Sequence, residues 1–450
     1  MSHFIWLHFL SGSVDMRIVR PSLSVLLVLF FSSVASAVEF SGQSNSYLFS
    51  RETSDSTRQL PFYEYLNFKA EDLGSPSISI HFGGWYRYDF QDETFGVKSS
   101  SDLQYAYLSL KRDTGNTFLN LGRLYVNEGT SSEIIDGAYG RTDFMGGFTV
   151  AAFGGHPVSP QGTIVNATGG GPVPPGSATR SDGSLYGGRI SQGIYGLYRV
   201  GFTYLLEKNS GTDFRKEEGL DLWLRPVDKV ELAGTSLYNA ITSDWAQHNY
   251  CLTLGPFSIV TFRTIYTYVS YKDYFTAATT TAFKLDPAII NPQETVSSIG
   301  EEVSFSLGKA ILSADYKRYS YDIAGDASYY GGRITYAGAH NVAAGLSVHR
   351  MDGQTDTLKY DEYRLYGSKK FDTIDIAIDL LTVSYDVEIN GVKNAYSASL
   401  AGGYALSAKA RLAADVEYEK DPFYNRNVTG LLKFVYNFDV RTGAKGGNNQ

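Results

Sequence analysis

Few residues of this chain are spaced for catalysis or metal binding. Cys251 is the only cysteine, so the chain can form no intramolecular disulfide, no cysteine-rich metal site and no CxxCH haem attachment. Seven histidines are spread over the sequence, none at the spacing of metal ligands, and no HExxH, GxSxG, GxGxxG or GxxxxGK(S/T) motif follows residue 37. A hydrolase site could still be assembled from distant Ser, His and Asp residues, but no set stands out. We therefore expect no enzyme activity, no cofactor and no metal.

Ionisable side chains instead recur at alternate positions, opposite apolar ones. In the segment Thr373–Asp386, Ile374 and Ile376 share one parity, whereas Asp375 and Asp379 share the other. Successive side chains of a strand point to opposite faces, so this strand has one apolar face and one acidic face. In a soluble β-sandwich the apolar face would point into a core. In a membrane barrel it faces lipid, and the charged face lines the lumen.

The N-terminal segment predicts export. An apolar run, Leu23–Phe31, follows Arg17 and Arg20, and the small residues Ala35–Ala37 supply a cleavage pattern. These features predict a signal peptide over residues 1–37, and Met16 is a candidate for the true start. The run is shorter than the ~20 apolar residues that a transmembrane helix needs, and no later window reaches that length.

The composition favours the membrane barrel. The chain has 34 tyrosines and 26 phenylalanines, and tyrosine suits the boundary between membrane and water because it combines an apolar ring with a polar tip. The net charge is −8, which argues against nucleic acid as a partner because binding phosphates requires a basic surface.

Alternating segments recur along the chain, joined by links that are in turn long and short. Tight turns such as Asp113–Asn116, Gly255–Pro256 and Gly308–Lys309 are rich in turn-forming residues. Short periplasmic turns and longer outer loops are typical of outer-membrane barrels, and the count predicts about 22 strands, within a range of about 18 to 22. The predicted long links are 51–61, 91–102, 127–133, 156–183, 209–217, 240–246, 272–296, 323–327, 351–357, 387–393 and 421–426.

Two of these links, 156–183 and 272–296, are the longest. They are either solvated external loops or loops that fold inward and narrow the bore. No N-terminal plug domain is expected, because the first strand begins within a few residues of Ala37. This disfavours TonB-dependent transporters, which are similar in strand number but begin with a folded plug.

The charged residues on the predicted lumenal parity would set the electrostatics of the bore. A charge facing lipid costs about 2–4 kcal/mol at the midplane, so these side chains must face water or protein. Charged rings set the field in channels, but both signs occur here, so we expect weak ion selectivity. The predicted lumen-lining residues are Arg87, Asp89, Arg199, Asp221, Arg225, Asp315, Lys317, Glu362, Arg364, Asp375, Asp379, Asp415, Glu417 and Lys433.

The last predicted strand places Leu432, Phe434, Tyr436 and Phe438 on one parity. It resembles the aromatic C-terminal strand that the outer-membrane assembly machinery recognises in porin-like barrels. The barrel is therefore predicted over residues 38–438. Residues 439–450 follow as a flexible tail, because they have little apolar content to bury.

A second resemblance lies in the first third of the chain. The run Leu121–Gly129 (LGRLYVNEG), followed by Asp136-Gly137 and Phe153–Gly155, is similar to a segment of porin-like outer-membrane barrels from metal-reducing bacteria. Some of these barrels sheathe a multihaem c-type cytochrome in a porin–cytochrome conduit. The resemblance covers about residues 121–155 and implies either an open barrel or one that holds a partner's haems.

Together these observations predict an all-β protein of the bacterial outer membrane, a transmembrane antiparallel up-and-down barrel. The predicted function is a porin-like channel for passive diffusion of small hydrophilic solutes or ions. The alternative is the sheath subunit of a porin–cytochrome electron conduit. The expected partners are outer-membrane lipid, the assembly machinery and, in the alternative, a multihaem c-type cytochrome. A third interpretation, an exported β-protein outside the membrane, predicts solubility without detergent.

Overall fold

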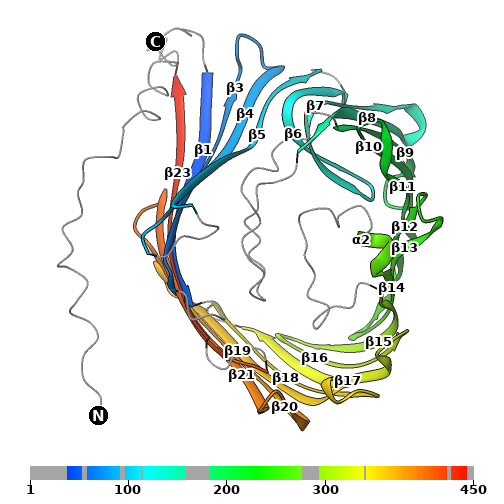
Figure 1. Ribbon diagram of the computed structural model, residues 1–450, viewed down its shortest axis with the longest axis vertical. Helices are drawn as coiled ribbons and strands as arrows, with labels where there is room; N and C mark the ends of the chain where they lie inside the picture. Colours follow the sequence, from blue (N-terminus) through cyan, green and yellow to red (C-terminus); the bar gives the residue numbers. More distant parts are fainter. Residues whose placement is uncertain are drawn as a thin grey trace, which may run out of the picture.

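Antiparallel strands, each paired with its sequence neighbour, form a closed ring (Figure 1). The computed structural model describes residues 38–52, 58–91, 97–112, 115–158, 183–275, 293–338, 341–422 and 427–442. Strand β1 (Val38–Glu52) pairs with β3 (Pro61–Glu71) on one side and with the last strand, β23 (Asn427–Thr442), on the other. The short β2 (Arg58–Gln59) pairs only with the last two residues of β1 and adds no separate position to the ring. The described residues therefore form a ring of 22 strands, as the sequence predicted.

The other strands follow the same up-and-down order. They are β4 (Ile78–Asp89), β5 (Ser99–Lys111), β6 (Phe118–Glu128), β7 (Ser131–Phe144), β8 (Phe148–Pro157), β9 (Gly183–Ile194), β10 (Tyr198–Asn209), β11 (Thr212–Val227), β12 (Val230–Asn239), β13 (Asp244–Phe257), β14 (Val260–Ser270), β15 (Thr295–Leu307), β16 (Ala310–Tyr321), β17 (Gly325–Ala337), β18 (Val342–Gly353), β19 (Lys359–Lys370), β20 (Ile374–Ile389), β21 (Val392–Ala405) and β22 (Ala410–Lys420).

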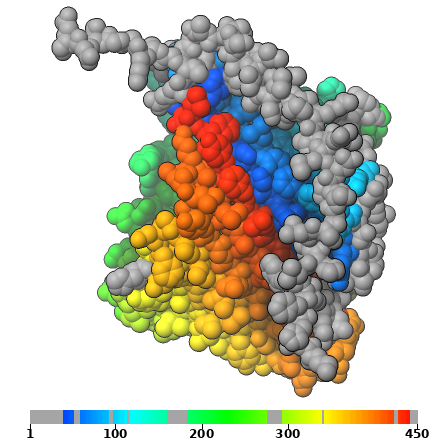
Figure 2. All heavy atoms as spheres, turned by 90° about the vertical axis from the view of Figure 1, so that its left-hand side faces the viewer, coloured from blue at the N-terminus to red at the C-terminus, as the bar shows by residue number. Residues whose placement is uncertain are grey.

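The closing seam satisfies the backbone of the first and last strands. Its register runs from Val38 opposite Thr442 to Ser50 opposite Gly430, and Figure 2 shows the blue and red strands side by side there. Closure leaves no free edge at this point, which a structure in lipid requires because hydrocarbon offers no hydrogen-bond partners. Within the described residues, no helix is long and apolar enough to cross a bilayer.

The outer face of the ring is apolar, as the alternation predicted. On β20, Ile374, Ile376 and Ile378 are 43%, 46% and 44% exposed, so they do not pack into a dry core. The opposite face of the same strand carries Asp375 and Asp379, which form ion pairs with Arg411 of β22 and Arg364 of β19. This arrangement is that of a barrel with a polar lumen and excludes a soluble sandwich with the isoleucines inside.

A lysine on the outer face should therefore be costly. We expect Ile378→Lys to lower the free energy of unfolding in phospholipid vesicles by about 2–4 kcal/mol if the site lies near the midplane, and by less nearer the surface. The matched control is Ser399→Lys, because Ser399 lies opposite Asp379 on the inner face of β21. Urea titration of both variants measures the difference, and equal costs would contradict the assigned faces.

Several links at one end of the barrel are shorter than predicted. Within 127–133, 209–217 and 387–393 the strands continue, and the turns are only Gly129-Thr130, Ser210-Gly211 and Asn390-Gly391. These turns place their first residues at positive φ, as tight hairpin turns require. Polarity misled the prediction here, because the polar residues of these segments lie on paired strands and not in loops.

Three other predictions can be placed against the structure. Gly255–Pro256 is not a turn but lies within β13, and the turn follows at Ser258-Ile259. Strand β23 continues to Thr442, beyond the predicted end at Phe438, because it pairs with the first residues of β1. The proposed signal peptide, residues 443–450 of the tail and most of the two longest links (159–182 and 276–292) lie outside the described residues.

Candidate functional site: a hairpin inside the bore

The distal part of the β6–β7 hairpin turns inward from the wall and lies inside the ring. Figure 1 shows this hairpin inside the ring, close to β10 and β11. Strand β6 pairs with β5 only from Phe118 to Arg123, and beyond Arg123 it pairs with β7 alone. At the tip, a Cβ added to Gly129 would overlap Thr203 Oγ1 of β10, and one added to Gly219 of β11 would overlap Thr130 Oγ1. The hairpin tip therefore touches the inner faces of β10 and β11.

A row of three glycines allows the sheet to bend. Gly122 of β6 is paired with Gly137 of β7, which is paired with Gly155 of β8. A Cβ on any of the three would overlap backbone atoms of the neighbouring strand, and Gly122 has a φ of 132°, which favours glycine. All three belong to the segment 121–155 that stood out in the sequence.

An apolar cluster holds the folded hairpin against the wall. Leu124, Val126 and Ile135 of the hairpin are fully buried and pack against Leu185 of β9 and Leu205 of β10. In a regular barrel, residues on this parity would face a wet lumen, so their burial depends on the inward fold. Burying such a side chain stabilises by about 1.5–3 kcal/mol, which makes this cluster the main source of docking energy.

The first charged contact joins Glu128 of the hairpin to Arg189 of the wall. Arg189 donates to both oxygens of Asp221 at 3.0 and 2.7 Å, and its Nη1 lies 3.7 Å from Glu128 Oε2. The Tyr139 hydroxyl donates to Glu128 Oε1. Glu128 and Arg189 are only 2% and 7% exposed, so the contact is shielded from water.

The second charged contact joins Glu133 of the hairpin to Arg215 of β11. Arg215 forms an ion pair with Glu133 and lies 3.5 Å from Glu207 and 3.7 Å from Glu217. One guanidinium thus balances three carboxylates from the hairpin and two wall strands. Removing it would leave like charges close together in a partly buried site.

At the root of the hairpin, Arg123 stabilises the separation of β6 from β5. Its Nε and Nη2 donate to Asp136 at 2.7 and 2.8 Å, and its Nη1 donates to the carbonyl of Leu103 at 2.9 Å. Leu103 belongs to the part of β5 that has no pairing with β6. The arginine therefore satisfies a backbone acceptor that the inward fold leaves without its strand partner.

The link after β14 also begins on the inner side of the ring. Helix α2 (Tyr271–Phe275) lies inside the wall in Figure 1, and Asn239 Nδ2 donates to the Asp273 carbonyl at 2.8 Å. On return, Glu294 accepts hydrogen bonds from the amides of Ile323 and Ala324 at 2.9 and 3.1 Å. Both ends of link 272–296 are therefore fixed to the wall, while its middle lies outside the described residues.

The predicted lumen-lining residues lie on the parity opposite the exposed apolar side chains, and the structure joins several to partners. Asp375 pairs with Arg411 at 2.6 Å, and Asp379 pairs with Arg364 at 2.5 Å. Other contacts are Asp221 with Arg189, Arg87 with Asp89, Asp315 with His349, Glu362 with Tyr329, Glu417 with Ser397, Lys317 over Tyr319, and Lys433 over Tyr47.

The set does not converge on one centre. Arg199 and Arg225 lie exposed near one rim, and Asp415 lies on β22. Among the described residues, no group of three or more His, Cys, Asp or Glu side chains is placed to hold a metal ion. The predicted lumen-lining residues are therefore spread along the wall of the barrel.

Sequence reasoning missed the charged residues that dock the hairpin: Glu128, Glu133, Arg189 and Arg215. Glu133 and Arg215 lie in segments predicted as loops. A charged side chain in a loop is expected to be solvated, so neither residue indicated a contact inside the bore. The available signal was the alternation Arg215, Glu217, Gly219, Asp221, which continues the lumenal parity of β11 through the predicted loop.

No protein-family model and no curated protein sequence matches the chain. Its structure resembles a variant of the ferric enterobactin receptor PfeA of Pseudomonas aeruginosa, with a TM-score of 0.54 at 11% identity over 90% of this chain and 81% of the receptor. The siderophore receptor PirA of Acinetobacter baumannii gives 0.52 at 12% identity, with coverage of 90% and 81%. OccK8 (OprE) of Pseudomonas aeruginosa gives 0.41 at 9% identity, with coverage of 90% and 98%.

At these identities the likeness concerns the fold alone. The described residues include no separate plug domain, and the β6–β7 hairpin inside the ring is continuous with the wall sheet. The chain is a 22-strand antiparallel barrel that resembles the outer-membrane barrels of Gram-negative bacteria.

Proposed function

We propose that this chain is a porin-like channel of the bacterial outer membrane, through which small hydrophilic solutes or ions diffuse passively. The observation that carries the proposal is the pairing of an apolar outer face with a charged inner face around a closed ring of 22 strands. Barrels of 16–18 strands already leave an aqueous channel, so a ring of this size has room for one even with a hairpin inside it.

The inner wall can guide solutes without binding them tightly. Its ion pairs, such as Arg364–Asp379 and Arg411–Asp375, carry both signs and are partly exposed to the lumen. Such pairs provide hydrogen-bond donors and acceptors that replace solute hydration, while their nearly balanced charge favours neither cations nor anions. In this proposal the protein catalyses no reaction. Its lasting partner is outer-membrane lipid, and it binds the assembly machinery only during insertion.

Conductance of the purified protein tests the proposal. We expect protein extracted from outer membranes to form discrete, ohmic channels in planar bilayers, with a cation-to-anion permeability ratio near one. A haem stain on the same sample tests the alternative function, the sheath subunit of a porin–cytochrome conduit. A multihaem protein that copurifies with a barrel that does not conduct would indicate this alternative. A protein that is soluble without detergent and does not conduct would contradict the proposal.

A further inference from the structure

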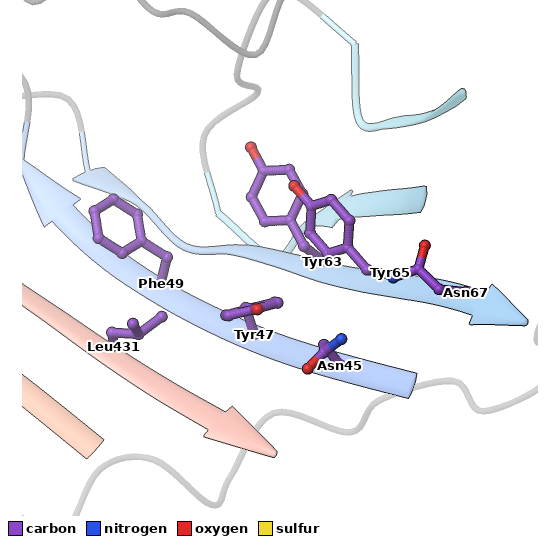
Figure 3. Close-up of a pocket in the computed structure, with 7 residues that line it drawn as sticks. All are labelled: Asn45, Tyr47, Phe49, Tyr63, Tyr65, Asn67 and Leu431. Atoms are coloured by element: carbon purple, nitrogen blue, oxygen red, sulfur yellow. The ribbon is translucent and has the colours of Figure 1, made fainter. Parts of the chain in front are cut away.

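A recess with a cavity volume of about 380 Å³ opens on the inner wall beside the closing seam (Figure 3). Its two main strands, β1 and β3, each contribute two aromatic rings and one asparagine, and β23 adds one leucine. Figure 3 shows the phenol groups of Tyr63 and Tyr65 side by side above β3, with Tyr47 on the neighbouring strand. The lining residues are Asn45, Tyr47, Phe49, Tyr63, Tyr65, Asn67 and Leu431.

The aromatic rings form a contiguous cluster, called the shelf below. Tyr63 and Tyr65 are stacked with ring centroids 6.1 Å apart, and Tyr47 meets Tyr65 edge to face at 5.5 Å. Trp85 extends the row, 6.2 Å from Tyr63. Each ring is held by its neighbours, so little side-chain entropy would be lost when a flat solute stacks on the shelf.

A rim of amides borders the shelf. Asn45 Nδ2 donates to Gln43 Oε1 at 2.8 Å, and Gln43 Nε2 donates to Asn437 Oδ1 at 2.8 Å. On the other side, the Tyr105 hydroxyl donates to Asn67 Oδ1 at 3.3 Å. These groups can donate to and accept from hydroxyls, and none of the lining residues carries a charge.

Two cations lie beside the recess, and both are already engaged. Arg87, the cross-strand partner of Tyr63, forms an ion pair with Asp89 and is only 1% exposed. The Lys433 ammonium lies 5.0 Å from the centroid of the Tyr47 ring, where the ring quadrupole attracts it. An anionic solute would therefore find no free cation among the lining residues, and a wholly apolar solute would strip water from phenols and amides without replacing those hydrogen bonds. The fitting ligand is neutral and flat, with an apolar face and a rim of hydroxyls.

We infer that this recess, the aromatic shelf of β1 and β3, binds the pyranose rings of neutral sugars as they pass through the channel. A pyranose presents C–H bonds on its face and hydroxyls around its edge, which match the tyrosine rings and the amide rim. The inference rests on the proposed channel function and names its solute class. Binding is weak, since a site on a diffusion path must release its solute.

The test uses maltohexaose and the full-length protein. In planar bilayers we expect maltohexaose to interrupt the ion current in a concentration-dependent manner, and isothermal titration calorimetry in detergent to detect binding. Tyr65→Ala should weaken both by about tenfold, whereas Tyr65→Phe, which keeps the ring, should weaken them only slightly. Tyr319→Ala is the matched control, because Tyr319 also stacks on a tyrosine of its own strand, away from the shelf.

Two outcomes separate this inference from the channel function. Ohmic conductance without sugar binding, or binding that Tyr65→Ala leaves unchanged, would overturn the shelf and leave the channel intact. Calorimetric binding that Tyr65→Ala abolishes, in a protein that does not conduct, would support the shelf and contradict the channel.

Discussion

Removal of the β6–β7 hairpin is expected to raise single-channel conductance by ~2-fold or more, because the hairpin occupies part of a lumen that 22 strands would otherwise leave wide. Arg123 and Asp136 already face each other as cross-strand partners, so residues 124–135 can be replaced by an Asn-Gly turn without changing the register below them. The shortened barrel keeps the Arg123–Asp136 ion pair at its new rim. Single-channel recording in planar bilayers measures the change.

The control shortens a hairpin that stays in the wall. Ser384 and Asn394 are partners on β20 and β21, and replacing residues 385–393 by the same turn removes a comparable tip from the rim. Its conductance should match that of the parent protein. If both shortened barrels conduct like the parent, the hairpin is not the constriction, and the narrowest point lies elsewhere in the bore.

For strands with clear alternation, such as β20, the sequence was sufficient to predict which side faces outward. Alternation fixes the two faces of a strand, and Ile376 beside Asp375 permits only one assignment in a membrane. The number of strands followed from the links, even where a turn such as Ser210-Gly211 proved shorter than expected. The face of a strand and the position of a turn both depend on residues close together in the sequence. A window of about ten residues is therefore enough to predict either one.

The inward fold of β6–β7 is not local. Gly122, Gly137 and Gly155 lie on three strands, and each alone is an ordinary strand glycine. The strand register places the three glycines side by side, and the sheet bends along this row. Leu124 and Val126 likewise alternate as they would in any strand, and nothing in their own segment shows that their burial partners come from β9 and β10.

The docked hairpin combines two kinds of contact that serve different purposes. Burial of Leu124, Val126 and Ile135 supplies most of the attraction but is non-directional. The ion pairs of Glu128 and Glu133 contribute less net energy, since desolvation offsets much of their attraction. They fix where the tip sits, because a shifted hairpin would leave these carboxylates buried without a cation.

Arg215→Met is therefore expected to release the hairpin without unfolding the barrel. The change leaves Glu133, Glu207 and Glu217 close together with no guanidinium between them, and breaking a buried pair costs about 3–5 kcal/mol. Glu133 is the only one of the three on the hairpin, so undocking relieves the repulsion. We expect channels that flicker between the parent conductance and a higher level, recorded in planar bilayers.

A double variant isolates the cause. Adding Glu133→Gln to Arg215→Met removes the carboxylate that the hairpin carries into the site, so the flicker should decrease and the parent conductance should return for most of the time. Arg318→Met serves as control, because it breaks an exposed ion pair with Asp326 on the outer face and should leave the current trace unchanged. Steady parent-like conductance in Arg215→Met would show that the apolar cluster and the Glu128–Arg189 contact hold the hairpin without Arg215.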